Sequence, residues 1–138
     1  MVSSLPDPSL ILIAERDKKV RELQRFFLER ANFQVAFVDS EQSAMEHIHT
    51  AQPVALVTEI LIGGMDGLTL CRRVSEDPLT SRIPVVVFSI LAAEVRARDA
   101  GASAFLRKPL VESTFIATIQ RVIATPPSTR SEPQWTST

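Results

Sequence analysis

The chain has 138 residues, and its 15 basic residues nearly balance its 16 acidic residues, which gives a formal net charge of −1. This balance argues against a nucleic-acid-binding protein and against attachment to an anionic membrane surface, since both usually need an excess of basic residues. Apolar residues make up 45% of the chain, which excludes disorder throughout and is enough for the core of one domain.

The two ends and five apolar runs outline the domain. Residues 1–8 and 125–138 carry several prolines and no periodicity, and we expect them to be disordered tails; the second holds the only tryptophan, Trp135. Short runs rich in Val, Ile and Phe lie between them, at residues 10–14, 35–38, 54–58, 84–89 and 103–106. Several of these runs do not alternate polar with apolar residues, which is typical of strands buried on both faces of a parallel sheet.

The segments between the first runs predict two helices. Asp17 is placed to cap the first helix at its N-terminus, and one apolar stripe follows at Val20, Leu23, Phe27 and Ala31. A second helix is expected near residues 40–51, after Asp39 or Ser40, with Gln42 as the loose partner of Asp39 in a capping box. Its inward positions are expected to be Ala44, Met45 and Ile48.

Three further helices complete the pattern. The third is expected to begin near Asp66 and to end at Asp77, before a proline, with Leu68, Cys71 and Val74 facing inward. The fourth, near 92–100, is short and stops at Gly101, a plausible glycine after the helix end. The fifth, at about 110–124, carries the stripe Phe115, Ile119 and Val122.

Five strand–helix units predict a single α/β domain at 9–124 with a doubly wound parallel sheet. In such folds the functional groups lie at the carboxyl ends of the strands. The polar residues expected at those ends are Glu15, Arg16, Asp39, Glu59, Ser89, Arg107 and Lys108.

The single cysteine and the apolar runs limit the setting of the protein. Cys71 cannot form an intrachain disulfide, and we expect it to be a small buried apolar residue. The longest uncharged apolar stretch, at 83–93, is far shorter than the roughly 20 residues that span a bilayer. Because the N-terminus also lacks the basic region of a signal peptide, a cytoplasmic protein is expected.

Four stretches carry a resemblance to a known family. They are ILIAERD at the end of the first strand, PVALVTEILIGGMDGLTLCRRV around the third, IPVVVFS at the fourth and DAGASAFLRKPL at the fifth. In this order they resemble the CheY-like receiver domain of response regulators, over about residues 9–124. The resemblance implies a flavodoxin-like sheet with the strand order 2-1-3-4-5.

The resemblance implies phosphoryl transfer to an aspartate at the end of the third strand, with Mg²⁺ bound beside it. Here Glu59 stands at that acceptor position, and Glu15-Arg16 stand where the family carries two acids. Arg16 has no lone pair to offer a metal ion. The sequence therefore resembles an atypical receiver, or pseudo-receiver, that lacks the acceptor aspartate.

The other positions match the family pattern more closely. Ser89 and Phe105 stand at the two switch positions and Lys108 at the invariant lysine. A typical pocket of three acids and one lysine has a net charge of −2, whereas the matching set here has two acids and two bases. We therefore predict that Glu59 lies in an ion-paired cluster with Lys108 and Arg16, that Mg²⁺ binding is weak or absent, and that no other cofactor is bound.

The expected function is that of a stand-alone, non-enzymatic receiver in two-component signalling that acts without phosphorylation. We expect it to bind a signalling protein or a second copy of itself through the fourth helix, fifth strand and fifth helix, around 92–100, Phe105 and the exposed side of 110–124. A histidine kinase is a further candidate partner; nucleic acid and membrane are not. Two alternatives stay open, a working phosphoswitch that uses Glu59 or a displaced aspartate and a flavodoxin-like cofactor-binding protein.

Overall fold

A computed structural model of the chain describes residues 9–125. The predicted tail at 1–8 and all of the tail predicted at 125–138 except Thr125 lie outside the described residues, Trp135 included. The elements alternate along the chain as β1 (Ser9–Ala14), α1 (Lys18–Arg30), β2 (Phe33–Val38), α2 (Glu41–Ala51), β3 (Ala55–Thr58), β4 (Leu61–Ile62), β5 (Met65–Asp66), α3 (Gly67–Glu76), β6 (Val85–Ser89), α4 (Glu94–Asp99), β7 (Ala104–Arg107) and α5 (Glu112–Ala124).

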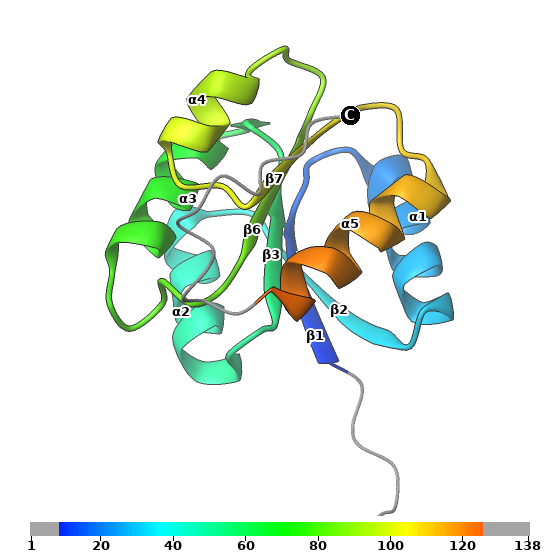
Figure 1. Cartoon of the computed structure of the whole chain (residues 1–138), viewed down its shortest axis with the longest axis horizontal. Coiled ribbons are helices and arrows are strands. Elements are labelled where there is room, and N and C mark those ends of the chain that lie inside the picture. The colour runs from blue at the N-terminus through cyan, green and yellow to red at the C-terminus, as the bar shows by residue number, and fades with distance from the viewer. Residues whose placement is uncertain (1–8, 126–138) are drawn as a thin grey trace, which may run out of the picture.

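The central sheet is parallel and has the order β2-β1-β3-β6-β7 (Figure 1). This is the predicted order 2-1-3-4-5, counted over the five strands of the sheet. β4 and β5 form a small antiparallel hairpin between β3 and α3, which the sequence analysis did not anticipate. The fold is therefore a doubly wound, CheY-like α/β domain.

Each face of the sheet has its own helical layer. Ile11 and Ile13 face Leu28 of α1 and the buried stripe of α5, whereas Leu12 and Ala14 face the layer made by α2, α3 and α4. Successive side chains of a strand point to opposite faces, and here both faces are covered. This explains why the strands read as continuous apolar runs.

The helix starts agree with the predicted caps, and at α2 the cap is Ser40, one of the two residues that the sequence left open. Asp17 accepts hydrogen bonds from the amides of Lys19 and Val20, as expected for the cap of α1. In α2 the cap is Ser40, whose hydroxyl accepts from the Ser43 amide at 3.0 Å. The predicted capping box of Asp39 and Gln42 is therefore wrong, because the helix begins one residue too late for Asp39 to reach its first amides.

The buried side of α1 also differs from the predicted stripe. Leu23 is 46% exposed, whereas Leu28 and Gln24 are fully buried. The buried side of α1 thus includes the polar residue Gln24, which a search for an apolar stripe does not find. In α2 the expected inward residues Ala44, Met45 and Ile48 are buried, which confirms that part of the prediction.

α3 and α4 end as the sequence indicated, although α4 is shorter than expected. α3 begins after its cap Asp66 and ends at Glu76, before Asp77. Gly101 follows α4 with a φ of +96°, the left-handed conformation that glycine adopts most easily.

No helix of the described residues is long and apolar enough to cross a membrane.

Candidate functional site

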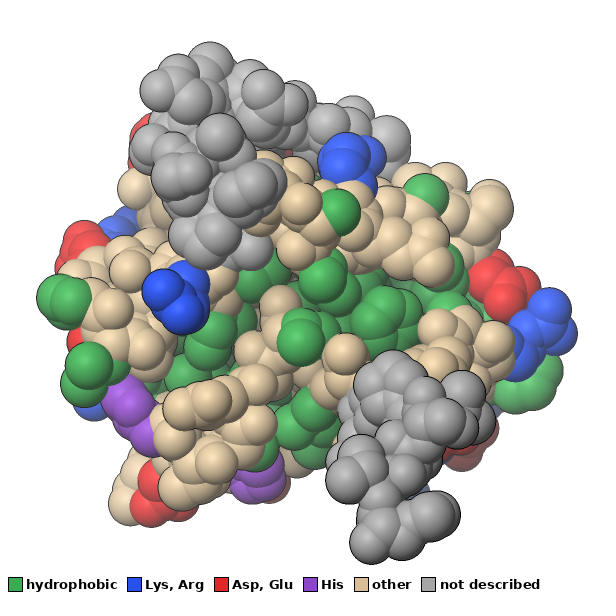
Figure 2. All heavy atoms as spheres, turned by 60° about the horizontal axis from the view of Figure 1, so that its bottom comes forward, with side chains coloured by type: hydrophobic (Ala, Val, Ile, Leu, Met, Phe, Trp, Pro, Cys, Tyr) green, Lys and Arg blue, Asp and Glu red, His purple; other side chains and the backbone are tan. Residues whose placement is uncertain are grey.

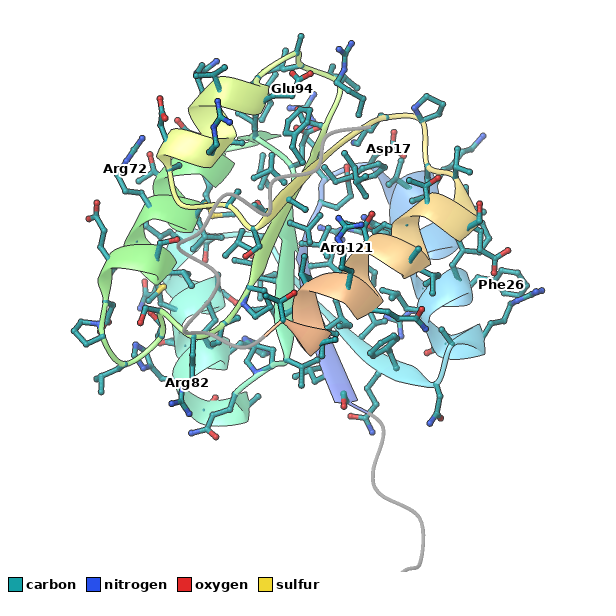
Figure 3. The ribbon with its side chains drawn as sticks, in the orientation of Figure 1. Asp17, Phe26, Arg72, Arg82, Glu94 and Arg121 are labelled. Carbon is teal, nitrogen blue, oxygen red and sulfur yellow. The ribbon has the colours of Figure 1, made fainter. Side chains whose placement is uncertain are left out.

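Charged side chains gather at the edge of the sheet where the strands end. Asp17 and Glu94, both labelled in Figure 3, lie at this upper edge, at the starts of α1 and α4. Figure 2 shows the opposite edge, where the strands begin; there apolar side chains fill the centre and charged ones lie around it. The candidate functional site therefore lies at the ends of the central strands.

Lys108 is the centre of the site. It follows β7, and its Nζ lies 3.0 Å from Glu15 Oε2 and 3.2 Å from Glu59 Oε1. The same ammonium group lies 5.5 Å from the centroid of the Phe88 ring. One lysine thus bridges carboxylates that come from the ends of two neighbouring strands, β1 and β3.

Glu15 is held from several sides and is 1% exposed. Its Oε2 accepts from the Asp17 amide at 3.1 Å in addition to Lys108, and its backbone oxygen accepts from the Arg21 guanidinium. Oε1 is buried and has no hydrogen-bond partner among residues 9–125. Glu15 therefore keeps one unpaired oxygen inside the pocket.

Glu59 turns its carboxylate back onto its own main chain. Oε2 accepts from the amide of Ile60, while Oε1 faces Lys108, and the residue is only 4% exposed. Its backbone amide donates to the Ala14 oxygen of β1 at 3.0 Å. Both carboxylate oxygens of Glu59 are therefore engaged within the protein.

The main chain under Glu59 is closely packed against the start of α3. A Cβ atom on Gly67 would lie 1.8 Å from the Glu59 backbone oxygen and 2.8 Å from Thr58 Oγ1. Gly67 also donates its amide to the Ile60 oxygen at 2.9 Å. The glycine of the Met-Asp-Gly motif is thus needed for close approach beneath the acceptor position.

Arg16 does not join the cluster, and this corrects the predicted three-way ion pairing. Its side chain is exposed, and within the described residues it forms no ion pair with Glu59. The residues in contact are two carboxylates and one ammonium group, with a net charge of −1 when all are ionised, and not the neutral set that was expected. An arginine at the rim is better hydrated in solvent than in a pocket that Lys108 already occupies.

The two switch positions are both buried. Ser89 accepts from the Leu91 amide at 3.1 Å through its hydroxyl, and its backbone oxygen accepts from the Lys108 amide at 2.9 Å. Phe105 is 0% exposed and packs in the core on the α2–α3–α4 side. The expectation that Phe105 forms part of an accessible binding face is therefore wrong, because its ring points inward.

The donor set does not fit a bound Mg²⁺ ion. Such an ion takes six oxygen ligands in octahedral array. Glu59 has no free carboxylate oxygen, Glu15 has one, and the position of the second acid is filled by Arg16. Within the described residues no group of three or more His, Cys, Asp or Glu side chains could hold a metal ion.

A separate groove lies between α2 and α3, away from this cluster. It has a volume of about 610 Å³ and is lined by Glu41, Gln42, Met45, Glu46, His49, Thr50 and Arg73. An exposed ion pair between Arg73 and Glu41 crosses it. It contains none of the residues that the sequence analysis placed in the site.

Sequence reasoning brought Glu15, Glu59 and Lys108 to one place but missed the groups that hold them. The Asp17 and Ile60 amides, the Arg21 guanidinium and the Phe88 ring all contact this cluster. Backbone amides leave no signal in a sequence. Phe88, inside an apolar run, gave no reason to expect a partner for a cation.

Comparisons with known proteins agree with the family resemblance and with the fold. The model of the response regulator receiver domain matches residues 11–120. The transcriptional regulatory protein CseB of Streptomyces coelicolor is 29% identical over 122 residues, which cover 86% of this chain and 51% of that protein. The chain thus spans about half the length of this relative.

Two solved structures share the fold closely. A structure from Chloroflexus aurantiacus has a TM-score of 0.81 and 30% identity, and the match covers 86% of this chain and 99% of that one. The signal receiver domain of a signal transduction histidine kinase from Syntrophus aciditrophicus has a TM-score of 0.77 and 27% identity, covering 84% and 90%.

Proposed function

The chain belongs to the response regulator receiver family of two-component signalling, and we propose that it acts there without phosphorylation, through contacts with other proteins. The observation that carries this proposal is the state of Glu59. At the acceptor position, both of its carboxylate oxygens are engaged, one by Lys108 and one by the Ile60 amide.

The geometry of attack supports the same proposal. A glutamate carboxylate stands one methylene further from the main chain than an aspartate carboxylate, and a misplacement of about 1 Å can cost a hundredfold in rate. Here the extra length carries Oε2 back to the Ile60 amide. Attack by Oε2 would have to disturb this contact, and attack by Oε1 would have to disturb the contact with Lys108.

Weak or absent Mg²⁺ binding is the second part of the proposal. A divalent ion cancels the net charge of −2 of a typical pocket, whereas here it would turn a net charge of −1 into +1, so the electrostatic drive for binding is weaker. Arg16 follows Glu15 in the chain and is exposed, so it supplies a positive charge where the family carries an acid and does not favour a cation nearby. Without the ion, the charge of a transferring phosphoryl group would lose its divalent partner and would depend on Lys108 and weaker hydrogen-bond donors such as the Ser89 hydroxyl.

The binding surface we propose is formed by α4 and α5 on either side of the edge strand β7 (Figure 1). Phe105 is excluded from it by burial, but Val95 of α4 and Ile90 just before that helix are each 59% exposed. Exposed apolar side chains rimmed by charged ones suit a protein partner. A signalling protein, a second copy of the chain and a histidine kinase are the candidates.

The test is exposure to a small phosphodonor, such as acetyl phosphate, with Mg²⁺, followed by intact-mass spectrometry. The wild type is expected to stay unmodified. The variant Arg16→Asp/Glu59→Asp, which restores the residue types of a typical receiver at both positions, is expected to gain one phosphoryl group. Glu59→Gln is the matched control that keeps the side-chain length and removes the charge.

The contradicting result is a hydroxylamine-sensitive phosphoryl adduct on wild-type Glu59. That result would establish the working phosphoswitch instead. A double variant that stays unmodified while folded would show that other positions, such as Ile90 beside Ser89, also block the chemistry.

A further inference from the structure

We propose that α1 is the helix that moves away from the sheet before the rest of the domain unfolds, and that this movement releases Glu15 in the pocket. The proposal concerns a movement of the fold and goes beyond the proposed function, since it holds whether or not Glu59 accepts phosphate. Its starting point is Gln24, a buried polar residue in the middle of α1.

Gln24 lies at the centre of the buried side of α1. It is one turn from Val20 and one turn from Leu28, and both of these residues pack in the apolar cluster between α1, the sheet and α5 (Figure 1). Gln24 is fully buried, and neither its amide nitrogen nor its amide oxygen has a hydrogen-bond partner within residues 9–125. The side chain thus brings donors and acceptors to a place that offers them no partner.

This buried amide weakens the attachment of α1 to the sheet. The amide gives up hydrogen bonds to water when the helix docks, and it gains none in return. The large apolar residues beside it do not compensate, because Leu23 is 46% exposed and Phe26 is 52% exposed. The ion pair of Arg30 with Glu112 of α5 is exposed on both sides and adds little. We therefore expect α1 to be held less firmly than the fully buried strands β3 and β6.

The first turn of α1 connects this helix to the pocket. The amide of Asp17, the cap of α1, donates to Glu15 Oε2 at 3.1 Å, and the Arg21 guanidinium donates to the Glu15 backbone oxygen. Arg21 lies about one turn before Gln24. When α1 moves away from the sheet, both hydrogen bonds break, while the contact of Glu15 with Lys108 can remain.

The test is hydrogen exchange of the 138-residue chain, followed at single amides by NMR. In the wild type we expect the amides at 22–30 of α1 to have protection factors about tenfold or more below those of β3 and β6, because α1 opens while the sheet stays folded. This comparison uses the wild type alone, so it does not depend on the folding of a variant. Equal protection of α1 and of the two strands would overturn the proposal.

The variant Gln24→Met tests whether the buried amide is the cause. Methionine has nearly the same length and flexibility as glutamine and no amide to bury. We expect it to raise the protection of the α1 amides about tenfold and to raise the Tm by several degrees. Gln120→Met, at an exposed position of α5, is the matched control and should change neither. Unchanged or lower protection of α1 in Gln24→Met would contradict the proposal.

The amide of Asp17 reports whether the pocket follows the helix. Because this amide donates to Glu15 Oε2, we expect its protection to rise in Gln24→Met by the same factor as that of the α1 amides. An Asp17 amide that keeps its wild-type protection while α1 gains would show that Glu15 is not released with the helix, and would refute the link to the pocket. No phosphodonor is present in these experiments, so their outcome is independent of the proposed function.

Discussion

Gly67 is the residue on which the main chain of the pocket depends most directly. A Cβ atom there would overlap the Glu59 backbone oxygen at 1.8 Å, and that oxygen belongs to the main chain, which cannot rotate away. We expect Gly67→Ala to lower the free energy of unfolding by about 3 kcal/mol or more, measured by urea denaturation.

Gly64, three residues earlier between β4 and β5, offers the matched control. A Cβ atom on Gly64 would meet nothing within 4 Å. Gly64→Ala should therefore stay within about 0.5 kcal/mol of the wild type. Equal losses for both variants would mean that general loop flexibility, and not the contact beneath Glu59, makes the glycines necessary.

The thiol of Cys71 is expected to make the free energy of unfolding depend on pH. Burial raises the pKa of its thiol to about 12, against lesser opposing effects of a hydrogen bond with Ser75 and the charge of Arg72. The unfolded chain therefore loses this proton near its ordinary pKa of 9.0, before the folded protein does. Between these values the stability should fall as the pH rises, with a limiting slope of about 1.4 kcal/mol per pH unit from this group.

The measurement is urea denaturation from about pH 8 to pH 10, where tyrosine cannot interfere because the chain has none. Cys71→Ala should be less stable than the wild type at pH 8 because of the lost packing. Its stability should fall less steeply with pH. The same slope in both proteins would show that other groups cause the alkaline loss.

Single residues of the site were predictable only where they carry charge in a recognisable motif. Glu15, Glu59 and Lys108 could be assigned to one pocket because each follows a buried strand of a parallel sheet. The orientation of Arg16 could not be predicted, because a side chain at the end of a strand can turn into the pocket or out to solvent. In this pocket the position between the two acids is already taken by Lys108.

At the scale of elements, the start of α2 provides a direct test of the corrected cap. Ser40 accepts from the Ser43 amide, and Asp39 lies outside the helix. We expect Ser40→Ala to cost about 1 kcal/mol of stability in urea denaturation. Asp39→Ala should cost less than half as much, and the reverse order would restore the capping box that the sequence suggested.

The elements themselves were predicted well where burial is complete. The strands read as continuous apolar runs because helices cover both faces of the sheet. The inward side of α1 was harder, since its buried line includes Gln24, a polar residue whose amide atoms have no partner within the described residues. The β4–β5 hairpin escaped notice because two strands of two residues each leave no periodicity to detect.

At the scale of the whole molecule, basic and acidic residues nearly balance. The cluster of Glu15, Glu59 and Lys108 at the ends of the strands is less balanced. The sequence predicted a neutral pocket, and the contacts give two acids and one base. The difference matters for the metal. With two acids in place of the three of a typical pocket, we predict a weaker attraction for a divalent ion, whatever the count of charges over the whole chain.

The central claim is that this receiver pocket is closed to Mg²⁺ and phosphate by its own residues. The most direct measurement is an amide NMR titration of the wild type with Mg²⁺ and beryllofluoride, an analogue of the phosphoryl group, with Arg16→Asp/Glu59→Asp as the responsive control. We expect no saturable shifts at the amides of Glu59, Ile60 and Ser89 in the wild type, and clear shifts at the same positions in the double variant. Saturable shifts at those amides in the wild type would contradict it.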